Sequence, residues 1–430
     1  MKLRLAALAV LMLAPCLPAH AQAPVAASRP VPSLTLDDAF ARVAAVHPDL
    51  RLSGARVAVL QAERETALLR PAWTLSADLE NALGSGEARA LRGAELTLGL
   101  ASVLERGGKL DARRTLADRR IDALAVERET RRLDLLAETA RRYLALVAAR
   151  EQRRLAGLDI EQRRRTVAAA RQRLQAGASP ESVVLTAQAA LAKAELERDR
   201  ADQRHAAARQ HLAALWGERD PGFDAAGGDP LALPRIEDAQ ALAALLERTP
   251  ELRQFADERR VREARLQLAR SEASPDLDWS LGVRRLQAGG DYGLVAGVSM
   301  TLGARERAQP AIRAAEAELA SLDIEREAKD MALYSTLVEA HGRYRVAQAE
   351  VVRLRDDVLP KLGRAEAAAE RAYRGGAISY LEWAQLQSEN TATRRQQLDA
   401  ALEAQRALIE LQRLTGQPLV AASPARGTTP

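Results

Sequence analysis

The sequence of 430 residues is poor in cysteine and has no long apolar run after its N-terminus. The single cysteine, Cys16, lies inside a segment with the features of a secretory signal. The exported chain would therefore have no thiol, no disulfide and no thiolate metal site. Beyond that segment no run of about 18 apolar residues occurs, which excludes a membrane span formed by a helix.

Catalytic motifs and an excess of one charge are also lacking. No Gly-x-Ser-x-Gly, phosphate loop or cysteine-based motif is present, so we expect no enzyme, no cofactor and no metal site. The 63 basic and 58 acidic residues alternate along predicted helices, which is typical of solvated helix faces and predicts no nucleic-acid partner. None of the histidines after the signal has an i, i+4 partner for a shared metal: His47, His205, His211 and His341.

What the N-terminus does contain is an export signal. Lys2 and Arg4 precede an apolar stretch at residues 5–13, and the small-x-small site Ala19-His20-Ala21 follows. Pro15, directly before Cys16, disfavours lipidation of that cysteine. Export without disulfides suits a bacterial envelope.

The rest of the chain repeats itself. The motif His47-Pro48-Asp49-Leu50-Arg51 recurs as Thr249-Pro250-Glu251-Leu252-Arg253, and residues 177–217 match residues 376–416 at a constant offset of 199. Thr97-Leu98-Gly99 also recurs, 204 positions on, as Thr301-Leu302-Gly303. These matches predict a tandem duplication of a unit of roughly 200 residues. We expect a signal peptide (1–21), a first repeat (22–217), a linker (218–235), a second repeat (236–416) and a disordered tail (417–430).

Each repeat has the same predicted order of elements. A helix (36–69 and 236–270) is followed by two strands (73–81 and 94–101; 276–284 and 292–302), which alternate apolar and polar residues. A very long helix, a glycine-containing break and a second long helix complete the unit. With no proline between residues 104 and 176, some 70 helical residues would extend over about 100 Å. Coiled-coil spacing predicts two helical seams: Leu185, Ala189, Ala192 and Leu196; Ala401, Ala404, Leu408 and Leu411.

The alternating strands indicate an outer-membrane barrel, with one face toward lipid and the other toward the lumen. Four strands cannot close such a barrel, and open edges are not tolerated in lipid. Several copies must therefore share one barrel. Three copies would supply twelve strands, enough for an aqueous lumen.

The order of elements, the repeated Pro-acid-Leu motif and Tyr373-Arg374-x-Gly376-x-x-Ser379 resemble the TolC-type outer membrane factor family over essentially the whole exported chain. Other segments resemble its CzcC-like heavy-metal efflux branch, although Ala101-Ser102-Val103 and Leu110 depart from the usual pattern. These segments are Glu80-Asn81-x-x-Gly84-Ser85-Gly86, Glu105-x-Gly107-Gly108-Lys109 and Arg113.

The resemblance implies a mainly α fold with a small β part, in which two repeats of long coiled-coil hairpins carry four strands into a trimeric twelve-stranded barrel. It further implies a homotrimer in the outer membrane lipid of a Gram-negative bacterium, with a periplasmic tunnel. Its partners would be a periplasmic adaptor protein and an inner-membrane pump of the resistance-nodulation-division (RND) type. The export of heavy-metal cations is the expected function.

The resemblance also implies functional positions. The breaks between paired long helices would form the tips that dock on the adaptor: Gly177, Ala178, Ser179, Arg374, Gly376 and Ser379. Glu382 and Gln385 would ring the narrowest point of the tunnel, where relatives have two aspartates. A spacing of three puts both on one helix face. The alternative for Glu382 is a solvated acid on the helix surface, with or without an arginine partner.

Other classes of protein remain open. A duct for drug efflux or type I secretion would have the same architecture. A periplasmic adaptor also has a coiled-coil hairpin, but normally one per chain, and a purely structural coiled coil would need no alternating strands. Two hairpins, each preceded by a strand pair, favour the duct.

Overall fold

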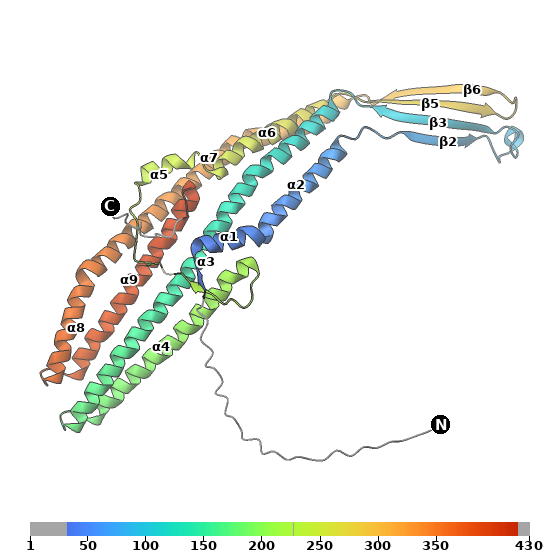
Figure 1. Cartoon of the computed structure of the whole chain (residues 1–430). Coiled ribbons are helices and arrows are strands. Elements are labelled where there is room, and N and C mark those ends of the chain that lie inside the picture. The colour runs from blue at the N-terminus through green and yellow to red at the C-terminus, as the bar shows by residue number, and fades with distance from the viewer. Residues whose placement is uncertain (1–31, 227, 420–430) are drawn as a thin grey trace, which may run out of the picture.

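The computed structural model describes residues 32–226 and 228–419 of an elongated molecule (Figure 1). A narrow sheet lies at one end, two helical hairpins lie at the other, and long helices connect them. The predicted signal peptide, Cys16 and most of the predicted tail lie outside the described residues. No helix in the described part has an apolar stretch long enough to cross a membrane.

Helices make up most of the described chain and follow the predicted order in both repeats. Their bounds are α1 (Leu36–Val46), α2 (Pro48–Ala67), α3 (Lys109–Gln175), α4 (Glu181–Ala213), α5 (Ala239–Leu246), α6 (Pro250–Ser271), α7 (Ala304–Arg353), α8 (Leu359–Arg374) and α9 (Tyr380–Thr415). Short 3-10 turns lie at Gly86–Ala88 and Ala214–Trp216, and a π-helical turn at Leu354–Val358 joins α7 to α8.

The first helix of each repeat is broken in two, where the sequence pattern predicted one helix. His47 has an extended backbone (φ −61°, ψ 130°), and its Nδ1 accepts a hydrogen bond from the backbone N–H of Asp49. Thr249 is extended in the same way before Pro250. A proline disfavours helical backbone in the residue before it but suits the first turn of a new helix. The repeated X-Pro-acid-Leu motif therefore marks a bend.

The strands form one antiparallel sheet in the order β2 (Thr74–Glu80), β3 (Glu95–Leu104), β5 (Leu277–Leu286) and β6 (Tyr292–Met300). The central pair, β3 and β5, joins the two repeats, and β3 runs three residues beyond its predicted end because residues 102–104 pair with residues 277–279. Strands β2 and β6 form the two edges. The Thr97-Leu98-Gly99 match is wrong as a structural equivalence, because Thr97 lies inside β3 whereas Thr301 follows β6.

The long helices pair as two hairpins, α3 with α4 and α8 with α9 (Figure 1). Helix α3 has 67 residues, which extend over about 100 Å. The predicted seam in α9 is confirmed, since all four of its residues are buried. The predicted seam in α4 is wrong: Leu185 and Leu196 are exposed, and the buried row contains Val184, Ala187, Ala194 and Ala201.

Midway along the molecule each repeat has a core of similar design. In the first, the Tyr143 hydroxyl lies 3.1 Å and 3.0 Å from the carbonyl oxygens of Leu34 and Ala226, which extend the small parallel pair of β1 (Ser33–Leu34) and β4 (Asp224–Ala225). In the second, the fully buried Tyr344 donates a hydrogen bond to the carbonyl oxygen of Pro234. Each buried tyrosine thus ties a long helix to the segment that crosses it.

Candidate functional site

One face of the sheet is apolar from its helix end to near its loop end, where Arg285 lies on it. On this face Leu98 is 54% and Val298 69% exposed. Soluble monomeric proteins rarely expose so long an apolar surface to water. Trp73 and Trp279 meet edge to face at the helix end of the sheet, with ring centroids 5.4 Å apart. Tyr292 lies at the opposite, loop end. An apolar band between aromatic residues at both ends is typical of the lipid-facing side of an outer-membrane barrel.

The opposite face of the sheet is polar and contains an ion-pair cluster. The guanidinium group of Arg284 lies 3.0 Å from a carboxylate oxygen of Glu80 and 2.8 Å from one of Glu95, and donates a hydrogen bond to Thr97 Oγ1. Glycine is required beside this cluster, since a Cβ at Gly282 would lie 2.8 Å from the carbonyl oxygen of Leu98. The sheet therefore has the two chemically distinct faces that the alternation predicted.

A buried lysine holds the sheet to the helices. Lys109, at the start of α3, lies 2.7 Å from Asp276 and 3.4 Å from Glu272, the residues that lead from α6 into β5. Burial by itself would lower the pKa of Lys109, but the hydrogen bonds and charges of these carboxylates raise it. The ammonium group therefore stays charged and fixes the angle between the sheet and α3.

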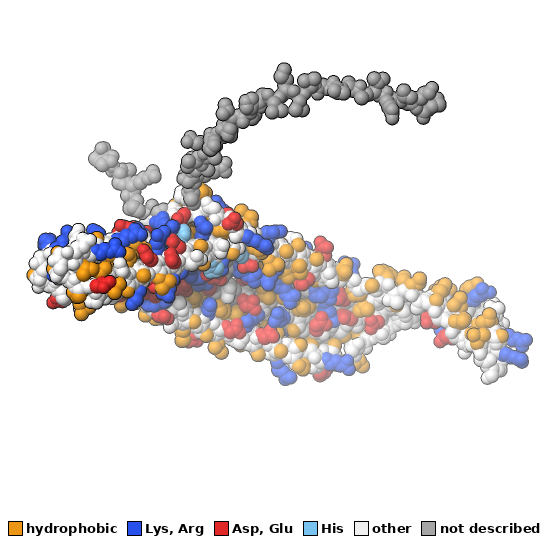
Figure 2. All heavy atoms as spheres, turned by 90° about the horizontal axis from the view of Figure 1, so that it is seen from below, with side chains coloured by type: hydrophobic (Ala, Val, Ile, Leu, Met, Phe, Trp, Pro, Cys, Tyr) orange, Lys and Arg blue, Asp and Glu red, His pale blue; other side chains and the backbone are white. Residues whose placement is uncertain are grey.

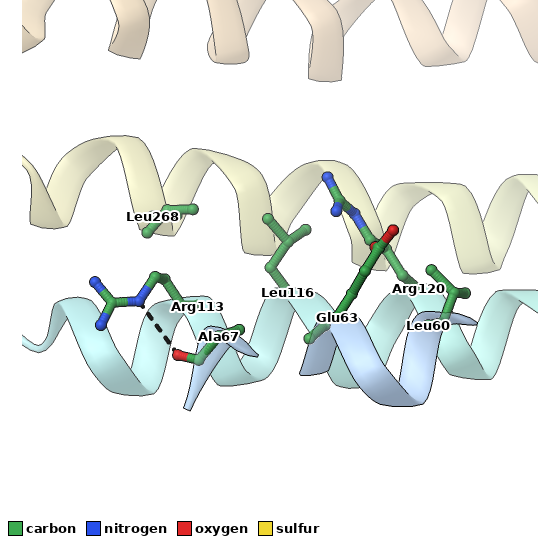
Figure 3. Close-up of a pocket in the computed structure, with 8 residues that line it drawn as sticks. Leu60, Glu63, Ala67, Arg113, Leu116, Arg120 and Leu268 are labelled. Carbon is green, nitrogen blue, oxygen red and sulfur yellow. Dashed lines mark hydrogen bonds between the residues drawn. The ribbon is translucent and has the colours of Figure 1, made fainter. Parts of the chain in front are cut away.

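Beside this lysine a cleft opens where α2, α3 and α6 meet (Figure 3). Arg113 forms a salt bridge with Glu105 and donates a hydrogen bond from Nε to the carbonyl oxygen of Ala67, 3.3 Å away, at the end of α2. The cleft is lined by apolar side chains from all three helices: Leu60, Leu116 and Leu268. The Glu105-x-Gly107-Gly108-Lys109 segment and Arg113 thus build the joint between the sheet and the helices.

The predicted docking residues lie in the two turns at the far end of the hairpins. Gly177 and Gly376 have positive φ angles of 67° and 82°, and in both turns the N–H two residues past the helix bonds back to a carbonyl of its last turn. This geometry is the glycine-terminated helix end that the sequence predicted. Ala178 and Ser179 follow Gly177 in the first turn, and Arg374, whose guanidinium pairs with Glu370, precedes the second.

Side chains outside the predicted set of docking residues connect these two turns. The guanidinium group of Arg173 donates hydrogen bonds to the carbonyl oxygens of Tyr373 and Ala178, and lies 4.8 Å from the centroid of the Tyr373 ring. Tyr373 stacks on Trp383, with centroids 5.0 Å apart, and meets Tyr380 edge to face. Three aromatic residues within eleven positions, in a chain with few aromatic residues, were the sequence signal that could have predicted this cluster.

The predicted gate residues, Glu382 and Gln385, are exposed in the first turns of α9. Glu382 forms a reciprocal capping box with Ser379: its Oε2 accepts hydrogen bonds from the Ser379 N–H and Oγ, each 2.8 Å long. These bonds, first from the backbone and then from the hydroxyl of Ser379, lower the pKa of Glu382. Among the side chains that the structure describes, Glu382 has no ion-pair partner, so it is an exposed surface acid, as the alternative has it, but without an arginine. The Ser-x-x-Glu pattern at residues 379–382 is the sequence signature of this capping box, which the sequence-based prediction did not use.

Comparison with known proteins identifies this architecture. The family described as "Outer membrane efflux protein" matches residues 18–218 and 241–417, one segment in each half of the chain. The chain belongs to the outer membrane efflux protein family. This is a family of channel proteins, and the predicted TolC-type fold and role as the outer-membrane component of an efflux system are confirmed.

Relatives of this outer membrane efflux protein include the cobalt-zinc-cadmium resistance protein CzcC of Cupriavidus metallidurans. The two are 30% identical over 279 residues, 65% of this chain and 67% of the relative. The fold is similar to that of CusC (TM-score 0.74, 17% identity, 89% of this chain and 92% of that one). It is also similar to that of VceC from Vibrio cholerae (TM-score 0.71, 17% identity, 90% and 97%).

Proposed function

We propose that this outer membrane efflux protein is the homotrimeric outer-membrane duct of a tripartite system that exports heavy-metal cations from a Gram-negative cell. The observation that carries the choice of cargo is the 30% identity with a cobalt-zinc-cadmium resistance protein. A drug-efflux duct is the second candidate, because the same architecture would serve either cargo. The outer-membrane channel OprN also has a similar fold (TM-score 0.72, 21% identity, 89% of this chain and 90% of that one).

The proposed trimer is supported by the way the two repeats pack against each other. Within the chain, neighbouring helices follow the order α2, α3, α6, α7. The strands follow the corresponding order β2, β3, β5, β6. Both series therefore end on an element of the first repeat at one edge and an element of the second at the other. A ring of copies would join β6 and α7 of one chain to β2 and α2 of the next, which leaves no open edge.

The internal repeat also indicates which residues would meet at the contact between copies. Val261 of α6 is 6% exposed and packs with Leu116 and the nearby Ala123 of α3, whereas its counterpart Val59 in α2 is 57% exposed. Ile324 of α7 is the counterpart of Ala123 in α3, since each lies 20 residues before the buried tyrosine of its repeat, Tyr344 or Tyr143. Ile324 is 69% exposed. In the proposed ring Val59 packs near Ile324 of the next copy and repeats the α3–α6 contact between chains.

The proposed partners at the helical end are a periplasmic adaptor and, through it, an RND pump. The two glycine turns with Arg374 and Ser379 are exposed at the tips of both hairpins, where a partner from the periplasm would meet them first. Threefold symmetry would place three copies of Glu382 near the axis of the tunnel. Such an acidic ring would attract cations and repel anions.

The cargo is tested by deleting the gene and measuring growth with graded zinc, cobalt, cadmium and copper salts and with a panel of drugs. We expect tolerance to at least one of the metals to fall and to return when the gene is restored on a plasmid. Loss of drug tolerance alone would replace the metal assignment with the drug-efflux candidate. Fractionation of the same strains should recover the protein in the outer membrane.

A further inference from the structure

We propose that Arg285, at the loop end of the apolar face of the sheet, binds a phosphate group of a lipid in the outer leaflet of the membrane. The proposal rests on the proposed function, since it requires the sheet to be part of an outer-membrane barrel. It assigns a ligand to an arginine that has no role in the proposed channel and no ion pair with the described residues.

The register of the sheet places Arg285 on the apolar face. It pairs with Leu96 of β3 on one side and with Tyr292 of β6 on the other. Its neighbour Arg284 points to the polar face, where Glu80 and Glu95 neutralise it. The two adjacent arginines therefore have different surroundings, and of the two only Arg284 has carboxylate partners among the residues that the structure describes.

Arg285 also lies at the loop end of the apolar band. Trp279, on the same face of the same strand, marks the helix end of the band, and Arg285 lies six positions farther along. At about 3.3 Å per residue this spacing is about 20 Å along the strand. For a strand tilted by about 40° it spans about 15 Å along the membrane normal, so Arg285 lies inside a band about 25 Å tall and its side chain must extend toward the headgroups. A guanidinium group at the edge of the band can reach the headgroups while its methylene stem stays in the apolar layer.

The guanidinium group lies beside an aromatic ring and has no carboxylate partner in the described part of the chain. It lies 6.0 Å from the centroid of the Tyr292 ring, and it forms no ion pair with the side chains that the structure describes. Figure 2 shows further basic side chains at this far end of the sheet, beyond the apolar ones. A lipid phosphate fits this site because a guanidinium group can bind two phosphate oxygens at once. The phosphorylated glycolipid of the outer leaflet, lipid A, has that chemistry.

The test measures binding of lipid A to the purified, delipidated trimer by native mass spectrometry, with dephosphorylated lipid A as the comparison probe. We expect the parent to bind lipid A in preference to the dephosphorylated form, and Arg285→Gln to weaken this binding about tenfold. Arg285→Lys should give an intermediate loss, because lysine keeps the charge but not the paired geometry. Tyr292→Leu should also weaken binding, whereas Tyr292→Phe, which keeps the ring, should not.

The matched control is Arg284→Gln, one residue away on the polar face, which should leave lipid A binding unchanged. Equal binding of both lipid forms by the parent, or parental binding by Arg285→Gln, would overturn the proposal. Displacement of lipid A by inorganic phosphate at millimolar concentration would also overturn it, since the site would then bind free phosphate. Failure of the proposed function is distinguishable, because no trimer would then be recovered from the outer membrane.

Discussion

At the scale of the residue, Glu382 combines a structural contact with the position proposed for the gate. Its carboxylate caps the N-terminus of α9 through Ser379 and remains exposed on the helix surface. The capping bonds favour the ionised form, so the charge proposed for the tunnel is maintained by the turn beside it. Gln385 supplies no charge, so the cation preference of the tunnel would depend on one acidic ring.

Replacing Glu382 tests the gate without removing the cap, because glutamine at this position can still complete a capping box. In planar bilayers, Glu382→Gln should reduce the preference for cations and the block by multivalent cations. The double variant Glu382→Ala with Gln385→Ala should raise the conductance. The control Glu327→Gln removes an exposed acid of α7, away from the hairpin tips, and should conduct like the parent. Parental selectivity in Glu382→Gln would move the gate elsewhere.

The lowered pKa of Glu382 also predicts how selectivity depends on pH. A carboxyl group with a depressed pKa keeps its charge as pH falls through its ordinary value and loses it only below that value. The cation preference should therefore persist from neutral pH down to about 4.5, the ordinary pKa of glutamate, and decline at lower pH. Reversal potentials measured across a salt gradient at stepped pH would show this. A decline already complete above pH 4.5 would contradict it.

The two faces of the sheet can be compared with neighbouring residues of β5. Leu281 is on the apolar face and Ser280 on the polar face, and both are exposed in the single chain. Leu281 lies inside the apolar band, beyond Trp279, so Leu281→Lys should destabilise the assembled barrel by about 2 to 4 kcal/mol, whereas Ser280→Lys on the polar face should have a small effect. Urea unfolding of the trimer in lipid vesicles measures both. Equal effects would mean that the face assignment is wrong.

At the scale of the element, the two hairpin turns combine the same backbone geometry with different side chains. Both turns end a helix on a glycine with positive φ, and only the second begins its next helix with a serine capping box. Arg173, from α3, reaches across to the second turn. The two tips are therefore held in register by one guanidinium group while their exposed residues remain free for a partner.

A bulky residue at the second tip should block docking. Ser379→Phe removes the cap, at a cost of about 1 kcal/mol, and places a large ring at the tip. We expect export of metal to be lost while the trimer and its insertion persist. Ser379→Thr keeps the capping hydroxyl and is the matched control. Metal tolerance equal to that of the parent in Ser379→Phe would place the adaptor elsewhere.

At the scale of the whole molecule, the trimer can be tested by cross-linking, because the chain after the signal has no cysteine of its own. Val59→Cys combined with Ile324→Cys should join neighbouring copies through a short thiol-reactive cross-linker and give covalent trimers on a denaturing gel. The control pair combines Val59→Cys with Arg326→Cys, because Arg326 is exposed on another side of α7. Monomers alone from both pairs would contradict the proposed ring.

Several elements could be predicted because their signals are local. Alternation over residues 292–300 identifies β6 nearly to the residue, and the absence of proline identifies α3. The glycines of the two turns are recognisable because few other residues adopt positive φ without strain. By contrast, the seam of α4 was placed on the wrong face, because alanine-rich helices have several faces that could pack and only the partner helix selects one.

The sequence by itself determined the duplicated plan, the strands with one apolar face, the long helices and the turns that reverse them. Each of these follows from periodicity or from the backbone preference of a single residue. Only the tertiary structure decided that β3 pairs with β5, that Lys109 closes the joint and that Arg173 ties the tips. Those contacts join residues more than 150 positions apart, and such pairings depend on how whole helices pack, which no local pattern records.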